Sequence, residues 1–551
     1  MANVKFDREE FEKEVKLTKE NQEKITMFGT PLESINDEEI EIEVFPNRPD
    51  LLSLQGYLRA LKAFLGEEKG LKKYKLRSPN KNYKVDIDES VKEVRPYTAC
   101  AIIDGLELDD EKIKEIVDVQ EKIHKTFGRE RRKVAIGIYP LEKIELPIRY
   151  EARNPKDIKF QPLEAKGEMD GRQILSRHPT GREYGHLLED EEKYPIFIDS
   201  KDQILSMPPI INSHQTGKIN KDTRKVFIEC SGFDFEILNK TLNMLVTVFA
   251  EMGAKIYQMN LNYPKGFGTG KEKTPNLDSE EMKIDLEKIN NLLGLELDKD
   301  KLGELLERMR YNYKKTKEVV EIPAWRTDIL HWVDIAEDVA IAYGYDNFDP
   351  EIPEVATTGK RDKREEKKKK IADILMGLDM LETSTYHILP KDNLNKLRAK
   401  RERIEVKDSR TEHKVLRPEM LPSILKVLSE NVKSEYPQKI FEIGKCFSKD
   451  KKEDTGIMET DKLAIAITPG NYTKMKQVID YLFRMLDLEY KIEEKEVNDL
   501  EFIEGRTASI QFEDKEVGYL GEVHPSLLKS WSLKMPLTYL EINLDKIFPK
   551  M

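Results

Sequence analysis

Two segments rich in glycine, proline and charged residues interrupt this chain and constrain how it can fold. The first, PKGFGTGKEKTPNL, spans residues 264–277, and the second, DPEIPEVATTGK, spans residues 349–360. Such segments are poor continuations of a helix or a central strand and usually connect separately folded parts. The chain has 551 residues, more than one hydrophobic core normally accommodates, so we expect roughly three to five domains.

The strongest local pattern lies in the first part of the chain. Residues 39–45 alternate acidic and apolar side chains, as a half-buried strand does, and the rigid turn PNRPD follows. We expect Asp50 in this turn to cap the amphipathic helix LLSLQGYLRALKAFLG, which Gly66 should end.

Changes in apolar pattern divide the rest of the chain. Apolar stretches alternate with helical patterns from about residue 95 onward and predict a mixed α/β domain built on a sheet. The polar, lysine-rich residues 76–94 are expected to form a linker before it. A small helical and strand-containing domain follows, then a large α/β domain in which strands follow helices. The expected domains, in a multidomain α+β protein, are residues 1–75, 95–262, 272–348 and 360–551.

Bulk composition disfavours several functional classes. Charged residues make up 36% of the chain and the net charge is −11, so wholesale wrapping of nucleic acid is not expected and RNA contact must come from local basic patches or a partner. Three cysteines without CxxC spacing disfavour a zinc site and indicate a reducing compartment. The N-terminal segment lacks the apolar core of a secretory signal, and no apolar run reaches the ~18 residues of a membrane span. We therefore expect a cytoplasmic protein without membrane contact.

A glycine-rich stretch, GFGTGK, superficially resembles a phosphate-binding loop. Lys265 stands where a Walker loop needs glycine, and Glu272 stands where it needs serine or threonine. The dinucleotide fingerprint would need a third glycine at Lys271. We interpret the stretch as a flexible linker.

Four carboxylates gather in the sequence WRTDILHWVDIAEDVAIAYGY. Asp334, Glu337 and Asp338 follow i, i+3, i+4 spacing and share one helix face, while Asp328 precedes that helix. Like charges so close repel unless a cation or a basic partner compensates them, and hard oxygen ligands suit Mg²⁺. The residues alone also allow a solvated acidic face balanced by Arg326 and the helix N-terminus.

Other candidate groups carry weaker signals. The eight histidines show no HExxH pair, which disfavours a zinc hydrolase. Ser213 and Ser231 lie near Glu229 and His214 in sequence, but no GxSxG elbow is present, so loop hydroxyls are the plainer interpretation. The basic stretch KTFGRERRK at residues 125–133 and the run KREEKKKK could each contact phosphate, although such runs are usually solvated surface.

Eight sequence blocks taken together resemble one family, the phenylalanyl-tRNA synthetase β subunit of the archaeal and eukaryotic type. They occur in order and touch every expected domain. The blocks are VFPNRPDLLSLQGYLRALKAFLG, KTFGRERRKVAIGIYPLEKI, HPTGREYGHLL, LSMPPIINS, PAWRTDILHWVDIAEDVAIAYGYDNF, LRPEMLPSILKVLSEN, YPQKIFEIGKCF and GYLGEVHP.

The resemblance implies a domain order and a metal site. The domains would be an N-terminal B1-type domain, a B3/4 editing domain, a small B5 domain and a catalytic-like B6/B7 domain with the antiparallel sheet of class II synthetases. The family's Mg²⁺ site, described as shared with the α subunit, would fall on the four carboxylates named above: Asp328, Asp334, Glu337 and Asp338.

The resemblance also divides the chemistry between subunits. Class II cores bind ATP phosphate through arginine side chains, and one of these arginines lies near a glutamate on a strand. Here Lys439 lies three residues before Glu442, and no arginine lies near it in sequence. No synthetic catalytic residue is therefore expected in this chain. ATP would be bound mainly by the α subunit of an (αβ)₂ heterotetramer, which attaches phenylalanine to tRNA(Phe).

The B3/4 domain in this family hydrolyses tyrosine wrongly attached to tRNA(Phe). A second site of this kind is needed because a phenylalanine pocket excludes tyrosine imperfectly. The family motif places a carboxylate and a hydroxyl before a glycine, and here the sequence is Glu229-Cys230-Ser231-Gly232. Ser213 matches the family's other hydroxyl position, so Ser213, Glu229 and Ser231 are the expected editing residues.

Two further classes of function remain open from the sequence. The chain could be a stand-alone binding protein that kept the fold without the partner. It could also be a free-standing hydrolase that uses residues 95–262. The acidic cluster favours the subunit, because those carboxylates need a counterpart.

Overall fold

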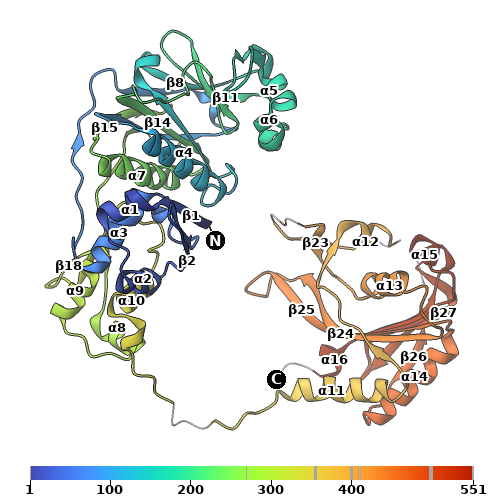
Figure 1. The fold of residues 1–551 in the computed structure, drawn as a ribbon. Helices are drawn as coiled ribbons and strands as arrows, with labels where there is room; N and C mark the ends of the chain where they lie inside the picture. The colour runs from blue at the N-terminus through green and yellow to red at the C-terminus, as the bar shows by residue number, and fades with distance from the viewer. Residues whose placement is uncertain are drawn as a thin grey trace. The chain divides into compact units, whose positions relative to one another are not determined.

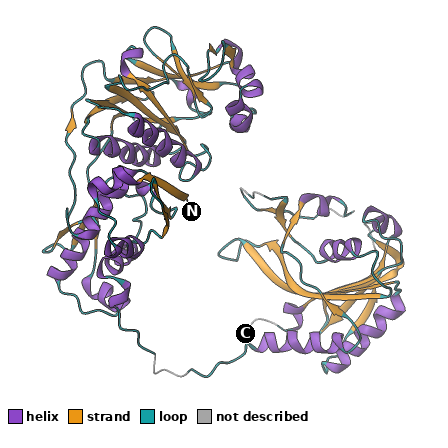
Figure 2. Cartoon of the chain, in the orientation of Figure 1, coloured by secondary structure: helices purple, strands orange, loops and turns teal. Residues whose placement is uncertain are grey.

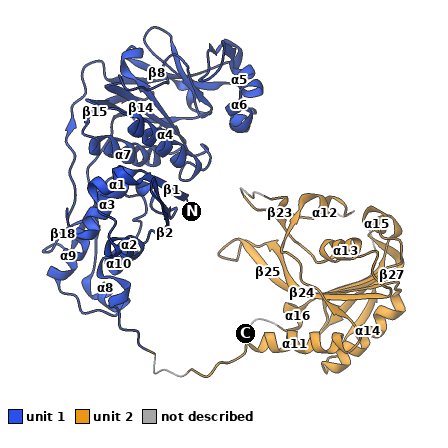
Figure 3. Cartoon of the chain, viewed as in Figure 1, with its two compact units in different colours: residues 1–351 blue, residues 352–551 orange. Residues whose placement is uncertain are grey.

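The computed structural model describes residues 2–268, 270–352, 357–397, 401–407, 409, 411–495 and 501–548. The chain forms two compact units, residues 1–351 and 352–551, each containing helices and strands (Figures 1, 2 and 3). The expected connecting segment 349–360 includes residues 353–356, which lie outside the described residues.

The first part of the N-terminal unit is a small antiparallel sheet with helices. Alternate residues of β3 are buried, as the alternating pattern predicts. The helix after PNRPD ends at Gly66, whose φ of +89° is the left-handed conformation expected there. The cap of this helix differs from our expectation: Ser53 accepts the backbone N–H of Gly56, and Asp50 instead accepts hydrogen bonds from Arg48. The elements are β1 (Ala2–Asp7), α1 (Arg8–Glu14), α2 (Lys19–Met27), β2 (Leu32–Ile35), β3 (Glu39–Val44), η1 (Pro49–Leu51) and α3 (Leu54–Leu65).

A large mixed sheet forms the middle of this unit. Its strand order is β13-β12-β11-β8-β5-β15-β6-β14-β7, with β4 and β16 also pairing with β15. The strands are β4 (Leu76–Arg77), β5 (Lys84–Ile87), β6 (Tyr97–Asp104), β7 (Val134–Pro140), β8 (Ile148–Arg153), β11 (Tyr194–Ile198), β12 (Ile204–Met207), β13 (Ile211–Asn212), β14 (Lys225–Gly232), β15 (Lys255–Asn262) and β16 (Lys271–Thr274).

Helices cover one face of this sheet. The helices α4 (Asp110–Lys125) and α7 (Phe235–Glu251) lie together beneath β14 and β15 in Figure 1. The strands β6 and β14 are buried along nearly their whole length, because apolar clusters lie on both faces of the sheet. Two short helices, α5 (Gly171–Arg177) and α6 (Pro179–Tyr184), follow the small strand pair β9 (Lys159–Phe160) and β10 (Met169–Asp170).

Two expected linkers contribute to this sheet. Strands β4 and β5 fall within or beside residues 76–94 and pair parallel with β15. Strand β16 falls within residues 264–277 and pairs antiparallel with β15. These short polar strands gain their structure from backbone hydrogen bonds to a neighbour, so their sequence carries little signal of it.

The last part of the N-terminal unit contains a small antiparallel sheet and helices. A continuous apolar cluster includes Phe11, Leu245 and Val339, and so joins this part to the first sheet and to the helical face of the large sheet. The elements are β17 (Glu280–Lys283), α8 (Leu286–Leu293), α9 (Lys299–Arg308), β18 (Asn312–Lys314), β19 (Val319–Ile322) and α10 (Trp332–Tyr343).

The C-terminal unit is built on a mainly antiparallel sheet of order β20-β24-β25-β29-β28-β27-β26, with a smaller sheet of β21, β23 and β22 beside it. Its helices are α11 (Lys363–Met376), α12 (Lys391–Asn395), α13 (Leu421–Glu430), α14 (Tyr472–Met485), α15 (Pro525–Ser530) and α16 (Leu544–Ile547). Its strands are β20 (Leu381–Glu382), β21 (Ile388–Pro390), β22 (Ile404–Glu405), β23 (His413–Leu416), β24 (Gln438–Lys449), β25 (Ile457–Thr468), β26 (Lys491–Glu494), β27 (Phe502–Phe512), β28 (Lys515–Val523) and β29 (Thr538–Asn543).

The chain is thus a multidomain α+β protein, as predicted. Among the described residues, no helix combines the length and the apolar character needed to span a membrane.

Candidate functional site

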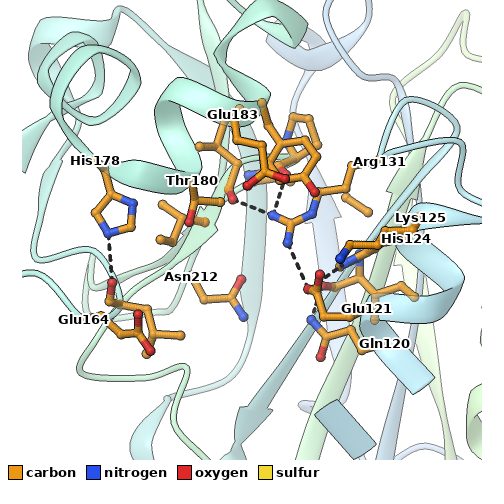
Figure 4. Close-up of a pocket in the computed structure, with 18 of the residues that line it drawn as sticks. Gln120, Glu121, His124, Lys125, Arg131, Glu164, His178, Thr180, Glu183 and Asn212 are labelled. Carbon is orange, nitrogen blue, oxygen red and sulfur yellow. Dashed lines mark hydrogen bonds and ion pairs between the residues drawn. The ribbon is translucent and has the colours of Figure 1, made fainter. Parts of the chain in front are cut away.

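A cavity of about 330 Å³ lies beside the large sheet (Figure 4). Its walls come from β7, β13 and β14 and from the helices α4 and α6. Figure 4 shows the side chains of α4 on the opposite side of the cavity from His178, the residue immediately before α6. The lining residues labelled there are Gln120, Glu121, His124, Lys125, Arg131, Glu164, His178, Thr180, Glu183 and Asn212.

Glu229 contributes a buried carboxyl group to this cavity from β14. Its side chain is only 1% exposed, and the Tyr139 hydroxyl donates a hydrogen bond to its Oε1 at 3.2 Å. Gly137 lies directly opposite Glu229 on β7, and a Cβ there would come within 2.0 Å of the Tyr139 hydroxyl. The glycine therefore leaves the space in which Tyr139 reaches Glu229.

Burial keeps this carboxyl group protonated near neutral pH. Desolvation raises the pKa of Glu229 to about 8, although the side chains of Arg95, Tyr139 and Ser231 act in the opposite direction. The second oxygen, Oε2, is buried and has no hydrogen-bond partner among the described residues. A neutral carboxyl group can donate a hydrogen bond from such an oxygen to a polar group of a ligand.

Ser231 is held by Arg95 and does not line the cavity. Arg95 donates from Nε to the Ser231 hydroxyl at 3.2 Å and from Nη2 to the Ser231 carbonyl oxygen at 2.6 Å. Both side chains are buried, and Ser231 is not among the residues that line the cavity. This places Ser231 as a support for the end of β14.

Ser213 also stands one position away from the cavity. Its backbone N–H donates to the Leu205 carbonyl oxygen, and its hydroxyl accepts a weak hydrogen bond from Gln215 at 3.4 Å. The preceding residue, Asn212, lines the cavity and accepts a hydrogen bond from the Tyr139 hydroxyl at 3.3 Å. Of the three expected editing residues, only Glu229 is therefore a direct part of the wall.

His178 is a cavity residue that the sequence reasoning did not single out. Its Nε2 lies 3.0 Å from the Leu163 carbonyl oxygen, which can only accept, so Nε2 carries the proton in the neutral ring. Its Nδ1 is then a proton acceptor, and it is buried without a partner among the described residues. The only signal in the sequence was its place in the block HPTGREYGHLL.

A second histidine, His124, lines the same cavity but both of its ring nitrogens are engaged. Nε2 accepts the backbone N–H of Ile136 at 2.8 Å, and Nδ1 lies 3.3 Å from Glu121. Arg131 donates to Glu121 at 2.9 Å and to the Ile210 carbonyl oxygen at 2.8 Å. Hydrogen bonding from His124, together with the charge of Arg131, lowers the pKa of Glu121 to about 2. Glu121 is therefore ionised, and its contacts with His124 and Arg131 support the cavity wall.

The four expected metal-binding carboxylates line a different cavity of about 660 Å³ in the same unit. Arg326 occupies two of them: it donates to both oxygens of Asp328, at 2.8 and 2.7 Å, and to Asp338 at 2.8 Å. Although burial acts in the opposite direction, the Arg326 charge holds the pKa of Asp328 below its usual value. Tyr311 also donates to Asp338.

The other two carboxylates differ from this buried pair. Asp334 caps the start of α10 by accepting the backbone N–H groups of Leu330 and His331 at 2.8 and 2.7 Å. Glu337 is exposed and has no hydrogen bond or ion pair among the described residues. Burial, Asp338 and Asp334 raise its pKa. In the part of the chain that the structure describes, no three such side chains are arranged as a metal site.

Two curated relatives of this chain carry the same name. The phenylalanine–tRNA ligase β subunit of Pyrococcus horikoshii is 41% identical over 509 residues, which covers 91% of this chain and 90% of that protein. The protein of the same name from Archaeoglobus fulgidus is 36% identical over 537 residues, covering 95% of this chain and 94% of that protein. The chain belongs to the phenylalanine–tRNA ligase β-subunit family. It is therefore a subunit of a ligase of protein biosynthesis.

Family models and a solved structure agree with this membership. A model described as "tRNA synthetase B5 domain" matches residues 282–345, and one described as "Phenylalanyl tRNA synthetase beta chain CLM domain" matches residues 349–544. The crystal structure of an N-terminal fragment of the phenylalanyl-tRNA synthetase β subunit from Pyrococcus horikoshii is similar, with a TM-score of 0.59 and 39% identity. It covers 62% of this chain and 99% of that fragment.

The C-terminal unit of this β-subunit chain contains an arginine–glutamate pair that the sequence did not reveal. Arg417 donates from Nη1 to Glu442 at 2.7 Å and from Nε to the Lys445 carbonyl oxygen at 2.7 Å. The two residues are 25 positions apart in sequence. The Arg417 side chain is completely buried, and a Cβ on Gly444 would lie 2.2 Å from its Nη2. Internal contacts engage Nε and Nη1 of this guanidinium, while Nη2 is buried without a hydrogen-bond partner among the described residues.

Proposed function

We propose that this β-subunit chain hydrolyses tyrosine wrongly attached to tRNA(Phe) in the cavity around Glu229. The observation that supports this most is a buried, neutral carboxyl group whose Oε2 has no partner among the described residues. The cavity volume of about 330 Å³ is within the range of small-ligand sites. In this proposal, Oε2 of Glu229 contacts the phenol of the tyrosyl group.

The phenol explains how such a site would select tyrosine. Oε1 already accepts from Tyr139, so the protonated Oε2 can donate to the phenol oxygen. Phenylalanine offers no such acceptor, and the buried donor would then stay unpaired at a cost in free energy. A site built to hydrogen-bond a hydroxyl discriminates strongly against the analogue that lacks it. Correctly attached phenylalanine would therefore be spared.

The hydrolysis itself needs a water molecule and a proton acceptor. We propose that Nδ1 of His178 accepts a proton from water as the water oxygen bonds to the ester carbonyl carbon. The bond between that carbon and the ribose oxygen then breaks, and the ribose oxygen takes the proton back from His178. Tyrosine and tRNA with a free hydroxyl are the products, and His178 returns to its neutral form.

Two substitutions at Glu229 test the recognition step in the full-length chain. Glu229→Gln keeps a neutral side chain that can donate a hydrogen bond, whereas Glu229→Met keeps the length without the donor. We expect Glu229→Met to lower kcat/KM for deacylation of Tyr-tRNA(Phe) by about tenfold to a hundredfold, and Glu229→Gln to retain most of it. Equal deacylation by wild type and Glu229→Met would remove Glu229 from the recognition step.

His178 is tested separately from recognition. His178→Gln is expected to lower kcat with little change in KM, because Gln lacks a basic nitrogen. His214, an exposed histidine that does not line the cavity, provides the matched control as His214→Gln. A fall in kcat for both variants alike would argue against His178 as the proton acceptor.

We also propose that amino-acid activation belongs to a partner α subunit in an (αβ)₂ assembly. Arg417, which pairs with Glu442, is completely buried, so it does not present an accessible guanidinium to ATP phosphate. Aminoacylation should appear only when this chain and the α chain of its host are co-expressed, at a native mass of two copies each. Charging of tRNA by this chain alone would contradict the proposal that activation belongs to the α subunit.

A Mg²⁺ ion fits only part of the acidic cluster. Arg326 forms ion pairs with both Asp328 and Asp338, so neither is a free ligand. Asp334 and Glu337 remain, and Mg²⁺ commonly takes one or two carboxylates and completes its shell with water. We propose that these two would hold the ion at the α-subunit contact, where its charge offsets their repulsion.

The effect of Mg²⁺ on assembly tests this site. Glu337→Gln removes one proposed ligand without disturbing the Asp334 cap of α10. We expect this variant to lose the strengthening of the α–β complex that Mg²⁺ gives to wild type. Exposed Glu351, which is outside the cluster, provides the control as Glu351→Gln. Equal Mg²⁺ dependence of wild type and Glu337→Gln would reject the site.

A further inference from the structure

The segment that joins α4 to β7 has an unusual backbone. We call residues 125–133, KTFGRERRK, the basic loop. Three consecutive residues, Arg129, Glu130 and Arg131, have φ values of 49°, 54° and 64°. L-residues with side chains rarely adopt this left-handed region, and a run of three in a row requires firm support from its surroundings.

Contacts on the protein side provide that support. The Arg95 guanidinium donates to the Arg131 carbonyl oxygen at 3.3 Å, and the Arg131 backbone N–H donates to the His124 carbonyl oxygen at 3.1 Å. The Arg131 side chain is itself held by Glu121 and lies over the Tyr184 ring, with 4.3 Å between its Cζ and the ring centroid. The backbone of the basic loop is thus fixed in place.

The remaining cations of the basic loop are exposed and have no partner among the described residues. Lys125, Arg129, Arg132 and Lys133 are exposed, and none of them makes an ion pair or side-chain hydrogen bond with a described residue. The only acid in the loop is Glu130.

Two other cations of the same domain, by contrast, form ion pairs. Lys221 pairs with Asp110 at 2.6 Å, and Lys225 pairs with Asp104 at 3.1 Å. In a chain with a net charge of −11, these four cations lie together on one nine-residue loop that has a single acid. Such a patch attracts a polyanion even where the whole chain does not.

The basic loop borders the cavity that contains Glu229. Lys125 and Arg131 line that cavity, and Figure 4 shows both on the same side of it. Any aminoacyl group that enters carries its RNA with it, because the amino acid is esterified to the last ribose of the 3′ end. The phosphates nearest the cavity mouth would therefore be those of the terminal nucleotides.

We propose that the basic loop binds the phosphate backbone of the single-stranded 3′ end of the tRNA and so delivers the mischarged residue to the cavity. This inference rests on the proposed editing function and adds its RNA-binding surface. Lys125, Arg129, Arg132 and Lys133 make the phosphate contacts, and the fixed backbone presents them without a further ordering cost.

A triple variant tests this surface in the full-length chain. Arg129→Gln, Arg132→Gln and Lys133→Gln together remove three outward charges and leave the cavity lining intact. The matched control replaces three exposed cations that make no ion pair with a described residue: Lys255→Gln, Lys265→Gln and Lys271→Gln. Both variants change the net charge equally, and thermal unfolding at the wild-type temperature establishes that both are folded.

The split between KM and kcat distinguishes binding from chemistry. We expect the loop variant to raise KM for Tyr-tRNA(Phe) deacylation by about tenfold, with kcat nearly unchanged. The slope of log(kcat/KM) against log salt should become shallower by about 2, because each phosphate contact on a single strand contributes roughly 0.7. A loop variant that matches the control in KM and salt slope would overturn the proposal while leaving editing intact.

A binding measurement tests RNA binding by the basic loop even if the chain shows no deacylation. The probe is an RNA hairpin with a short single-stranded 3′ extension, compared with the same hairpin ending blunt. Wild type and control should prefer the extended hairpin, and the loop variant should lose that preference. If wild type binds both hairpins equally, the loop proposal fails. If the preference is present but Tyr-tRNA(Phe) is not hydrolysed, the editing proposal fails and the loop remains an RNA-binding surface.

Discussion

Individual residues of the cavity depend on neighbours that are distant in sequence. Glu229 was predicted from its motif, but its protonation depends on burial and on Tyr139, which is 90 positions away. That pair in turn requires Gly137 opposite Glu229. His178 became a candidate only when the fold showed Nδ1 unpaired. The sequence shows which residue types are present, but the charge states and contacts of these residues depend on the fold and could not be predicted from it.

Glu229 should also make stability depend on pH. Its pKa is raised from 4.5 to about 8 in the folded chain. The folded state therefore holds this proton more tightly than the unfolded state, so the contribution to stability is complete below about pH 4.5 and is lost as pH rises toward about 8. Relative to wild type, Glu229→Gln should gain on the order of 4 kcal/mol in unfolding free energy across that range.

Urea unfolding of the N-terminal unit at a series of pH values measures this difference. Glu236 in α7 provides the control as Glu236→Gln, because its side chain is 79% exposed and its ion pair with Lys240 is long, at 3.8 Å. Its stability relative to wild type should vary little with pH. A pH-independent difference for Glu229→Gln would mean that Glu229 ionises normally in the folded protein.

Secondary-structure elements were predicted well where a pattern reflects local burial. The alternation in β3 and the glycine stop of α3 follow directly from side-chain period and backbone preference. The cap of α3 was assigned wrongly to Asp50, because the bidentate contact with Arg48 competes for that carboxylate. β16 was taken for a linker, because its structure comes from pairing with β15.

The entry to α10 depends on one buried cation. Arg326 is 4% exposed and joins Asp328, before the helix, to Asp338 within it. Arg326→Met would leave two buried carboxylates without a counter-charge, and should lower the unfolding free energy by about 3–5 kcal/mol. Lys314→Met, which breaks an exposed pair with Glu281 and a partly buried pair with Glu321, should cost less, on the order of 1 kcal/mol.

A charge-matched variant separates the electrostatic effect from lost packing at Arg326. Asp328→Asn with Asp338→Asn in the Arg326→Met background removes the unpaired charges and should recover part of the lost stability. Denaturant unfolding of the three proteins gives the comparison. If the triple variant is no more stable than Arg326→Met, packing rather than charge explains the loss.

At the scale of the whole molecule, the sequence predicted several parts but not how they combine. The expected domains 1–75, 95–262 and 272–348 share one apolar cluster and form a single compact unit. Arginines tie the parts further: Arg310 donates to the Arg59 carbonyl oxygen at 2.9 Å, and Arg308 donates to that of Phe64 at 2.9 Å. Such contacts join residues roughly 250 positions apart, and the pattern of one sequence does not contain them.

The compactness of this unit leads to a prediction about its independence. Residues 1–351 hold the cavity, the basic loop and their own continuous core, so a fragment ending at residue 351 should fold alone. We expect its thermal midpoint to match the first transition of the full chain, and its Tyr-tRNA(Phe) deacylation to persist. The fragment should fail to support phenylalanine charging with the α subunit, because the whole C-terminal unit is missing. If the full chain deacylates Tyr-tRNA(Phe) and a folded fragment does not, the editing site needs the C-terminal unit, whereas an unfolded fragment would refute the independence of its core.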